Sequence, residues 1–181
     1  MGSIKASDSA VRKQTIEKTV EAAVIDTPLG RLGLRLSDGA LAAVDFLPSD
    51  APLSYDGLSA EMTEIVGRFR RYFAGDAQAF DGLAISEEDG TPFQKDVWRA
   101  LKAIPYGQTR SYAEIARQLN KPGASRAIGQ ANRRNPLPIV VPCHRVITAD
   151  GGLGGYQGTQ GLEVKRALLA LESSKATPSR A

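Results

Sequence analysis

The chain has 181 residues, and its net charge of +3 hides an acidic first half (residues 1–90, 9 basic and 15 acidic residues, net −6) and a basic second half (residues 91–181, 14 and 5, net +9). The basic half indicates a polyanionic partner, and a composition of 42% hydrophobic and 24% charged residues is typical of a globular protein with one or two domains. With one Cys and one His, the chain has neither an internal disulfide nor a zinc site of four N and S ligands. No apolar run is long enough for a membrane-spanning helix, and the N-terminus lacks the apolar core of a signal peptide. We therefore expect a cytoplasmic, reducing location without a membrane partner.

The first half predicts a small antiparallel sheet and one helix, after a polar stretch at residues 1–18 that we expect to be a flexible tail. From residue 19, three strand-like runs are separated by turns at TPLG (27–30) and at Asp38-Gly39. The middle run alternates Leu32, Leu34 and Leu36, as a half-buried strand does.

A helix is predicted next, ending at Gly75. Its expected buried face consists of Met62, Ile65, Val66, Phe69 and Phe73. Residues 75–90 are rich in Gly and Asp and are the predicted linker between two domains.

The second half predicts a helix-turn-helix. Thr91 and Gln94 form a capping box at the start of a first helix, and Ser111 and Glu114 cap a second. Residues 125–134 predict a third helix, separated from the second by a short turn that contains Gly. Between residues 110 and 145 seven residues are basic and only Glu114 is acidic, which favours contact with phosphates over a generic solvated face.

Two elements are predicted after the helix-turn-helix. The apolar segment PLPIVVPCHRVITA (136–149) is interpreted as a strand interrupted by Pro, and LEVKRALLALE (162–172) as a final helix.

The single Cys and the single His are neighbours, Cys143-His144, which chance would produce in about one of 90 such chains. The pair suggests a Cys–His nucleophile, and the alternative is a small buried thiol beside a structural His. Adjacent side chains on an extended segment face opposite ways, so a bridging water would carry the thiol proton to the imidazole. Positive charge from Arg145 and the basic flank is expected to lower the pKa of the thiol.

A His base usually needs a third group that fixes its tautomer. The acidic candidates in this part of the chain are Asp150, Glu163 and Glu172. Glu172 follows Leu171 at the end of an apolar-faced helix, so it is the candidate for an inward-pointing carboxylate; a solvated residue at a helix end is the alternative.

Seven segments of the chain carry a family resemblance. They are TPLG (27–30), FQKDVW (93–98), IPYGQTRSYAEIA (104–116), RAIGQANRRNP (126–136), PIVVPCHRV (138–146), GGLGGYQG (151–158) and VKRALLALE (164–172). In this order they resemble the O6-alkylguanine-DNA alkyltransferases, also called methylated-DNA–protein-cysteine methyltransferases. PCHRV after a helix ending in Asn-Pro is the most specific match, and a papain-like hydrolase would instead carry a distant His.

The resemblance implies the reaction residues. Cys143 is the alkyl acceptor, activated by Glu172 and by His144 through a water. Tyr112 donates a hydrogen bond to the flipped base and helps to protonate the leaving guanine, and Asn135 is the hinge between helix and active-site strand. The structural alternatives are a Tyr112 that packs a helix start and an Asn135 that merely stops a helix before Pro.

The resemblance also implies a DNA face. Arg126 fills the space of the extruded nucleotide, and Tyr156 lies in the loop that closes over the base; the alternatives are a phosphate contact and a turn-packing residue. We further assign to DNA binding and base flipping Ser125, Ala127, Arg133 and Arg145. The helix is expected in the minor groove, with basic residues on the phosphate backbone.

The expected chemistry agrees with these roles. An alkyl carbon on guanine O6 is hidden in the base-paired stack, so the nucleotide must be flipped out. A soft thiolate suits attack on that carbon, and the thioether that forms has no hydrolysable acyl bond. One protein molecule should therefore repair one lesion, as a single-turnover methylated-DNA–[protein]-cysteine S-methyltransferase.

Two departures from the family pattern are visible. Gln130 and Gln157 replace residues that are small in many relatives, which predicts altered groove or pocket contacts. The Cys and His residues of an N-terminal zinc cluster, present in some relatives, are missing, so we expect neither metal nor cofactor.

Together these inferences predict an α/β (α+β) protein. Residues 19–88 are expected to form a ribonuclease H-like sheet-and-helix domain and residues 89–174 a mainly helical, winged-helix-like domain, between tails at 1–18 and 175–181. The predicted partner is double-stranded DNA that contains O6-alkylguanine, bound by a monomer; activity on O4-alkylthymine and cooperative binding are left open. The competing hypotheses are a lesion-flagging DNA-binding protein without transfer, which the intact Cys143 disfavours, and a Cys-dependent hydrolase.

Overall fold

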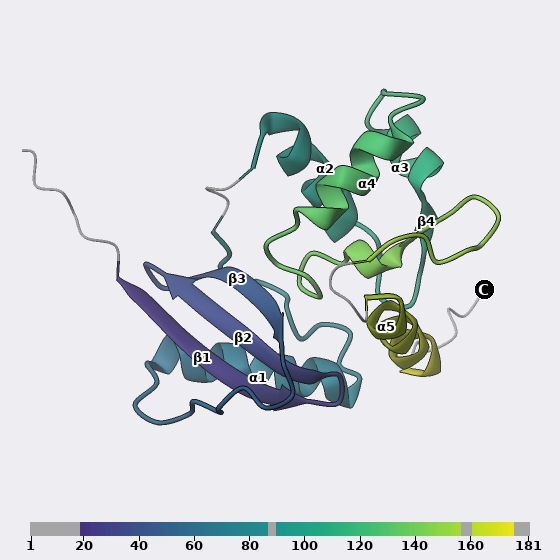
Figure 1. Cartoon of the computed structure of the whole chain (residues 1–181). Coiled ribbons are helices and arrows are strands. Elements are labelled where there is room, and N and C mark those ends of the chain that lie inside the picture. Colours follow the sequence, from purple (N-terminus) through teal and green to yellow (C-terminus); the bar gives the residue numbers. More distant parts are fainter. Residues whose placement is uncertain (1–18, 87–89, 157–160, 176–181) are drawn as a thin grey trace, which may run out of the picture.

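The computed structural model describes residues 19–86, 90–156 and 161–175, which form a mixed α/β fold (Figure 1). The sheet and its helix lie to one side of the molecule, and the helices of the second half lie to the other. Within the described residues no helix is both long and apolar enough to cross a membrane. The predicted tails fall outside these ranges, except for Lys175, which is the last residue of the final helix.

The first half begins with an antiparallel sheet in the order β1–β2–β3. Its strands are β1 (Val20–Thr27), β2 (Gly30–Ser37) and β3 (Ala40–Leu47), and the predicted turns join them. Asp38 and Gly39 both adopt positive φ (52° and 76°), as a two-residue hairpin turn requires. Leu32, Leu34 and Leu36 are buried, so the predicted alternation is confirmed.

Helix α1 (Ala60–Ala74) contacts β1 (Figure 1). Ser59 caps its N-terminus, and Gly75 ends it in the left-handed conformation (φ 100°), as the sequence predicts. One residue of the predicted buried face is wrong: Tyr72 is 1% exposed, whereas Phe73 is only partly buried. Both lie about one turn beyond Phe69. Tyr72 is the buried one of the two, and its hydroxyl donates a hydrogen bond to Glu172 of the second half.

The predicted linker is partly structured. Leu41 of β3 donates its backbone N–H to Ala84 (3.0 Å) and accepts from Ser86 (2.8 Å), so residues 84–86 extend the edge of the sheet. Ala79 is buried, and Phe80, Leu83 and Ile85 pack against the core. These apolar side chains explain why a segment rich in Gly and Asp is fixed on the sheet up to residue 86; residues 87–89 lie outside the described ranges.

The second half contains α2 (Pro92–Lys102), α3 (Tyr112–Gln118), α4 (Ser125–Arg133) and α5 (Gly161–Lys175). Both predicted capping boxes are present, at Thr91–Gln94 and at Ser111–Glu114. Helices α3 and α4 contact each other across a short turn, and α2 packs against both. Strand β4 (Arg110–Ser111) pairs in parallel with β5 (Val146–Ile147) beside them.

The segment at 136–149 differs from the predicted strand. Only Val146–Ile147 is a strand, and Cys143–Arg145 forms a single 3-10 turn, η1, closed by a hydrogen bond from Arg145 N–H to the Pro142 carbonyl (3.0 Å). Pro136, Pro138 and Pro142 have no backbone N–H and therefore cannot continue a strand ladder.

Candidate active site

The thiol of Cys143 lies in the η1 turn and is buried as a free cysteine. Burial raises the pKa of the Cys143 thiol, and this effect outweighs the opposing influence of a hydrogen bond from Asn135, the charge of Lys165 and the nearby hydroxyl of Tyr156. The cation that acts on the thiol is therefore Lys165, and the expectation that Arg145 would lower its pKa is wrong. At rest Cys143 is a neutral thiol.

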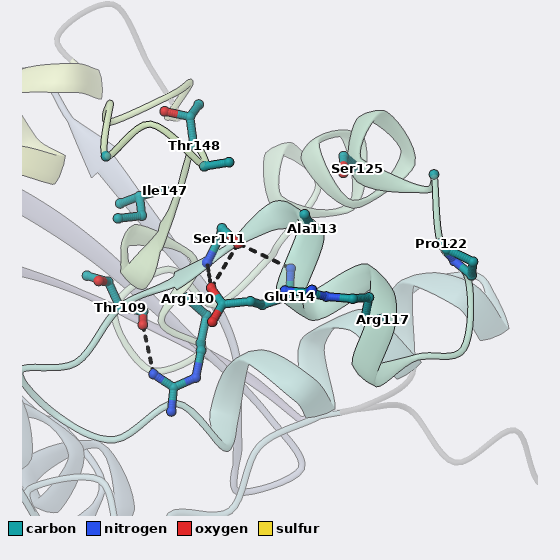
Figure 2. A pocket seen from close by; sticks show the side chains of 13 residues that line it. Thr109, Arg110, Ser111, Ala113, Glu114, Arg117, Pro122, Ser125, Ile147 and Thr148 are labelled. Carbon is teal, nitrogen blue, oxygen red and sulfur yellow. Dashed lines mark hydrogen bonds between the residues drawn. The ribbon is translucent and has the colours of Figure 1, made fainter.

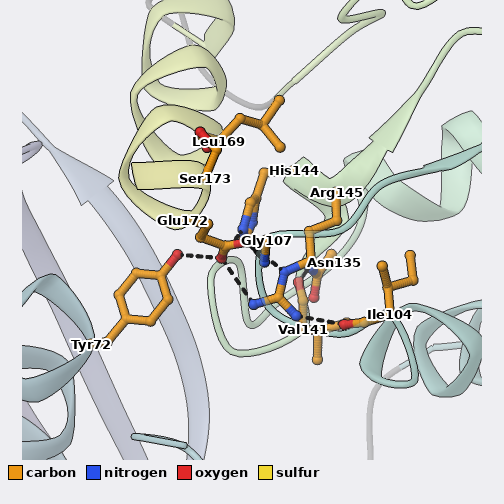
Figure 3. A network of polar contacts seen from close by, with 10 residues as sticks. All are labelled: Tyr72, Ile104, Gly107, Asn135, Val141, His144, Arg145, Leu169, Glu172 and Ser173. Carbon is orange, nitrogen blue, oxygen red and sulfur yellow. Dashed lines mark hydrogen bonds and ion pairs between the residues drawn. The ribbon is translucent and has the colours of Figure 1, made fainter. Parts of the chain in front are cut away.

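Glu172 organises a buried polar network beside this thiol (Figure 3). Its Oε1 accepts a hydrogen bond from His144 Nε2 at 2.8 Å, and Arg145 donates to both carboxylate oxygens, from Nε at 2.8 Å and Nη2 at 2.9 Å. Gly107 N–H donates to Oε2 at 3.1 Å. The carboxylate of Glu172 thus points inward from α5 and meets His144 across 28 residues of sequence.

The charges in this network determine the tautomer of His144. Burial opposes ionisation of Glu172, but hydrogen bonds from His144 and Arg145 outweigh it and hold the pKa of this carboxyl well below its usual range. Burial is the main cause of the lowered pKa of His144, against the attraction of Glu172. A neutral imidazole beside a carboxylate carries its proton on Nε2, so Nδ1 is left as a proton acceptor; no described residue hydrogen-bonds to it.

Asn135 connects the end of α4 to the η1 turn. Its Nδ2 donates to the Val141 carbonyl at 2.8 Å and to Cys143 Sγ at 3.3 Å, while its Oδ1 accepts from Leu137 N–H at 3.0 Å. This side chain fixes the position of the sulfur relative to the helix-turn-helix.

A cavity of about 600 Å³ lies over Cys143. It is lined by Tyr112, Ala113, Ser125, Arg126, Gly129, Gln130, Asn132, Arg133, Cys143, Thr148, Ala149, Gly154, Gly155 and Tyr156. Six of the predicted site residues therefore share its wall, since Tyr112, Ser125, Arg126, Arg133, Cys143 and Tyr156 are all among them. Ala127 is exposed on α4 and does not line this cavity. Gln157 lies outside the described residues.

The two tyrosines of this cavity are hydrogen-bond donors. Burial is the main cause of the raised pKa of Tyr112, with the nearby Cys143 adding to it, and burial likewise raises the pKa of Tyr156. Both hydroxyls therefore keep their protons at neutral pH.

A second hollow of about 620 Å³ adjoins the first (Figure 2). It is bordered by α3, the start of α4 and the segment after β5, and it shares Ala113, Ser125, Thr148 and Ala149 with the cavity over Cys143. Arg110 and Arg117 are exposed on its wall, while Glu114 is turned back onto Ser111 as its capping partner. The second hollow therefore shares part of its wall with the cavity over Cys143, and its exposed charged side chains are two arginines and the capping Glu114.

Arg145 differs from the expected DNA-contacting role. Its guanidinium is buried, binds Glu172 and donates from Nη1 to the Ile104 carbonyl at 2.6 Å. A buried cation of this kind is retained by its carboxylate partner, so the guanidinium of Arg145 is bonded inside the protein and not exposed on the surface.

Two residues of the site were missed from the sequence. Lys165 is fully buried and donates from Nζ to the Val146 carbonyl. Its position could have been found, because Lys165, Leu168 and Glu172 follow the i, i+3, i+7 spacing of one helix face. Tyr72 donates to Glu172 from 100 residues away, and no local pattern signals such a contact.

Comparison with known proteins identifies the family. Residues 92–174 match the family described as 6-O-methylguanine DNA methyltransferase, DNA binding domain. A methylated-DNA–protein-cysteine methyltransferase of Methanosarcina acetivorans is 44% identical over 156 residues, which cover 84% of this chain and 97% of that protein. One of Mycobacterium tuberculosis is 45% identical over 159 residues, covering 84% and 92%. The chain belongs to the methylated-DNA–protein-cysteine methyltransferase family.

Solved structures of this methyltransferase family share the fold. The crystal structure of the M. tuberculosis O6-methylguanine methyltransferase matches with a TM-score of 0.75 and 41% identity, covering 89% of this chain and 97% of that one. The structure of M. tuberculosis OGT in complex with DNA matches with a TM-score of 0.74 and 44% identity, covering 87% and 95%. The likeness spans both halves of the chain.

Proposed function

We propose that this protein repairs DNA by direct reversal, moving the alkyl group of O6-alkylguanine irreversibly onto Cys143. The observation that carries the proposal is a lone buried thiol at a cavity of about 600 Å³, backed by the His144–Glu172 pair, in a chain about 45% identical to named methyltransferases. A relative solved in complex with DNA supports DNA as the partner.

The geometry supports the following reaction. The damaged nucleotide leaves the duplex and its base enters the cavity over Cys143. The thiol proton passes, through a water, to Nδ1 of His144, and Glu172 stabilises the imidazolium that forms. Sγ then bonds to the alkyl carbon while the bond from that carbon to O6 breaks. The leaving guanine takes a proton from the Tyr112 hydroxyl, and the imidazolium of His144 returns a proton to Tyr112. The products are S-alkylcysteine and repaired guanine, and no step regenerates the thiol.

The DNA-binding role belongs to α4 and its surroundings. Arg126 would fill the place of the extruded nucleotide, and Ser125, Ala127 and Arg133 would contact the minor groove and the backbone. Arg126, Ala127 and Arg133 are exposed on α4, which supports this assignment. Tyr156 would close over the flipped base, and Asn135 would keep the sulfur in register with α4.

The finer architecture is also a proposal. A three-stranded meander with α1 against it suits a ribonuclease H-like domain over residues 19–88. The helix-turn-helix with the small β4–β5 pair suits a winged-helix-like domain over residues 89–174, acting as a monomer on double-stranded DNA.

Intact-protein mass spectrometry tests the function. After incubation with duplex DNA that carries one O6-methylguanine, we expect the wild type to gain one methyl group, located on Cys143, and Cys143→Ala to gain none. An unmodified wild type that binds the lesion would support the lesion-flagging alternative instead. Release of repaired DNA in molar excess over protein would support a hydrolase, and either outcome overturns the proposal.

A further inference from the structure

Tyr72 brings the first half of the molecule into contact with the reaction centre. It lies near the end of α1 and is 1% exposed, with its ring packed against Phe73 and Phe80 (centroids 5.3 Å apart in both cases) and Tyr106 (6.0 Å). Its hydroxyl donates to Glu172 Oε1 at 2.8 Å (Figure 3). The ring is thus held on three sides, and the hydroxyl is aimed at one oxygen.

That oxygen is the one that holds His144. Glu172 Oε1 accepts from Tyr72, from His144 Nε2 and from Arg145 Nη2, whereas Oε2 accepts from Arg145 Nε and Gly107 N–H. Among these described donors Tyr72 alone comes from outside residues 89–174. One of the hydrogen bonds that orient this carboxylate beside His144 therefore comes from a side chain of the first half.

We propose that Tyr72 is a positioning residue for alkyl transfer: its hydroxyl fixes Glu172 and so keeps His144 oriented with Nδ1 toward the thiol. This inference rests on the proposed function. A hydroxyl is not needed for packing, since a phenyl ring would fill the same space. Burial, reinforced by Glu172, raises the pKa of Tyr72 far above neutrality, so the hydroxyl remains a donor throughout the working pH range.

The substitution Tyr72→Phe separates positioning from packing. The charged groups that act on His144 are Glu172 and Lys165 of α5 and Arg145 of its own turn. Without Tyr72 the charge of Glu172 is shared among fewer donors, so it attracts the imidazolium more strongly and the pKa of His144 rises. We expect the acidic limb of the rate profile to move to higher pH, and the transfer rate at saturating DNA to fall about tenfold, a part of what general-base catalysis supplies.

Tyr106→Phe is the matched control. It removes a hydroxyl from the same aromatic cluster, and no described residue hydrogen-bonds to that hydroxyl. Single-turnover transfer of methyl from O6-methylguanine in duplex DNA would be measured against pH for the wild type and both variants, together with DNA affinity and Tm.

The outcomes distinguish the inference from the proposed function. A slower Tyr72→Phe with a shifted profile and unchanged DNA affinity, beside a Tyr106→Phe within about twofold of wild type, supports the inference. Equal rates for Tyr72→Phe and wild type overturn it, as does a loss that Tyr106→Phe shares or that follows the fall in Tm without a shift of the profile. A wild type that accepts no methyl overturns the proposed function itself.

Discussion

The site contains two buried cations, and among the described residues they differ in their partners: Arg145 is paired with a carboxylate, whereas Lys165 is bonded to a backbone carbonyl. Arg145 is bound in a bidentate manner by Glu172, so its charge is already matched in the resting protein. Lys165 donates to the Val146 carbonyl, which carries no charge and so does not neutralise the ammonium group. The charge of Lys165 acts on Cys143. The positive charge of Lys165 would therefore stabilise the Cys143 thiolate that forms during the reaction.

Lys165→Met is expected to slow alkyl transfer while leaving the fold intact. Without the cation the pKa of Cys143 rises further, so less thiolate is available and the rate at pH 7 should fall about tenfold. Single-turnover kinetics would measure the rate, and the ultraviolet absorbance of the thiolate would follow Cys143, the single cysteine of the chain. The exposed Lys102→Met is the control, and an equal fall in both variants would contradict the specific role of Lys165.

The same variant makes a prediction about stability. Burial lowers the pKa of Lys165 from 10.5 to about 8, so between these pH values the folded state holds fewer protons than the unfolded state. The cost of burying the charged lysine, up to about 3 kcal/mol at pH 7, is therefore relieved as the pH rises. In urea unfolding, the stability of Lys165→Met relative to wild type should be highest near pH 7 and decline toward pH 10. A difference that does not change with pH would contradict this.

At the scale of single residues, the sequence indicates which residues carry the chemistry more readily than it indicates which residues touch one another. Cys143 and His144 stand out because each is the single residue of its type, and Glu172 because it follows an apolar helix face. The structure brings these three together. Tyr72 could not be found this way, since its partner lies 100 residues further along the chain.

At the scale of elements, the segment after β5 faces α3 across the cavity. Gly154 adopts a positive φ of 65°, and a Cβ at this position would lie 3.0 Å from the Tyr112 hydroxyl and 3.1 Å from its ring. The close approach requires glycine for its backbone conformation and for the space it leaves. The spacing between this segment and Tyr112 thus determines the width of the cavity.

Gly154→Ala is expected to lower the transfer rate by displacing Tyr112. Both the strained backbone and the contact with the phenol push the segment away from α3, and a misplacement of this order costs about tenfold to a hundredfold in rate. The measurement is single-turnover transfer from O6-methylguanine DNA. Gly155→Ala, where a Cβ would meet nothing within 4 Å, is the matched control. The expectation fails if Gly154→Ala transfers as fast as its neighbour.

Elements with local signals were predictable from the sequence. The capping boxes at Thr91 and Ser111 and the Asp38-Gly39 turn depend on neighbouring residues, and all three are confirmed. The η1 turn was mistaken for a strand because its apolar pattern resembles one, whereas the prolines decide its backbone. The attachment of residues 84–86 of the predicted linker to the sheet could not be predicted, because their pairing with Leu41 depends on tertiary contact.

At the scale of the whole molecule, opposite charges are separated in space. The acidic first half forms the sheet and α1, and the basic second half carries the helix-turn-helix on the far side of the molecule (Figure 1). Such a separation would direct polyanionic DNA to one face. Polar contacts between the described residues of the two halves include Val44 N–H to the Pro136 carbonyl (2.9 Å) and Tyr72 to Glu172.

The basic wall of the second hollow should contribute to DNA affinity through phosphates. Arg110 and Arg117 are exposed there (Figure 2), and this hollow shares lining residues with the cavity over Cys143. Each phosphate contact contributes about 0.9 to the slope of log affinity against log salt, so Arg110→Ala/Arg117→Ala should bind more weakly and reduce the slope by about 1 to 2. Fluorescence anisotropy with duplex DNA over a range of salt concentrations measures both quantities.

Arg70→Ala/Arg71→Ala is the matched control, because it removes the same charge from exposed positions on α1 of the acidic half. Its slope should stay near that of the wild type, since α1 lies away from α3 and α4. Transfer from the free base O6-methylguanine, which has no phosphates, should be the same in all three proteins. If the control pair lowers the slope as much as the Arg110/Arg117 pair does, the net charge of the chain governs binding and the basic wall has no role of its own.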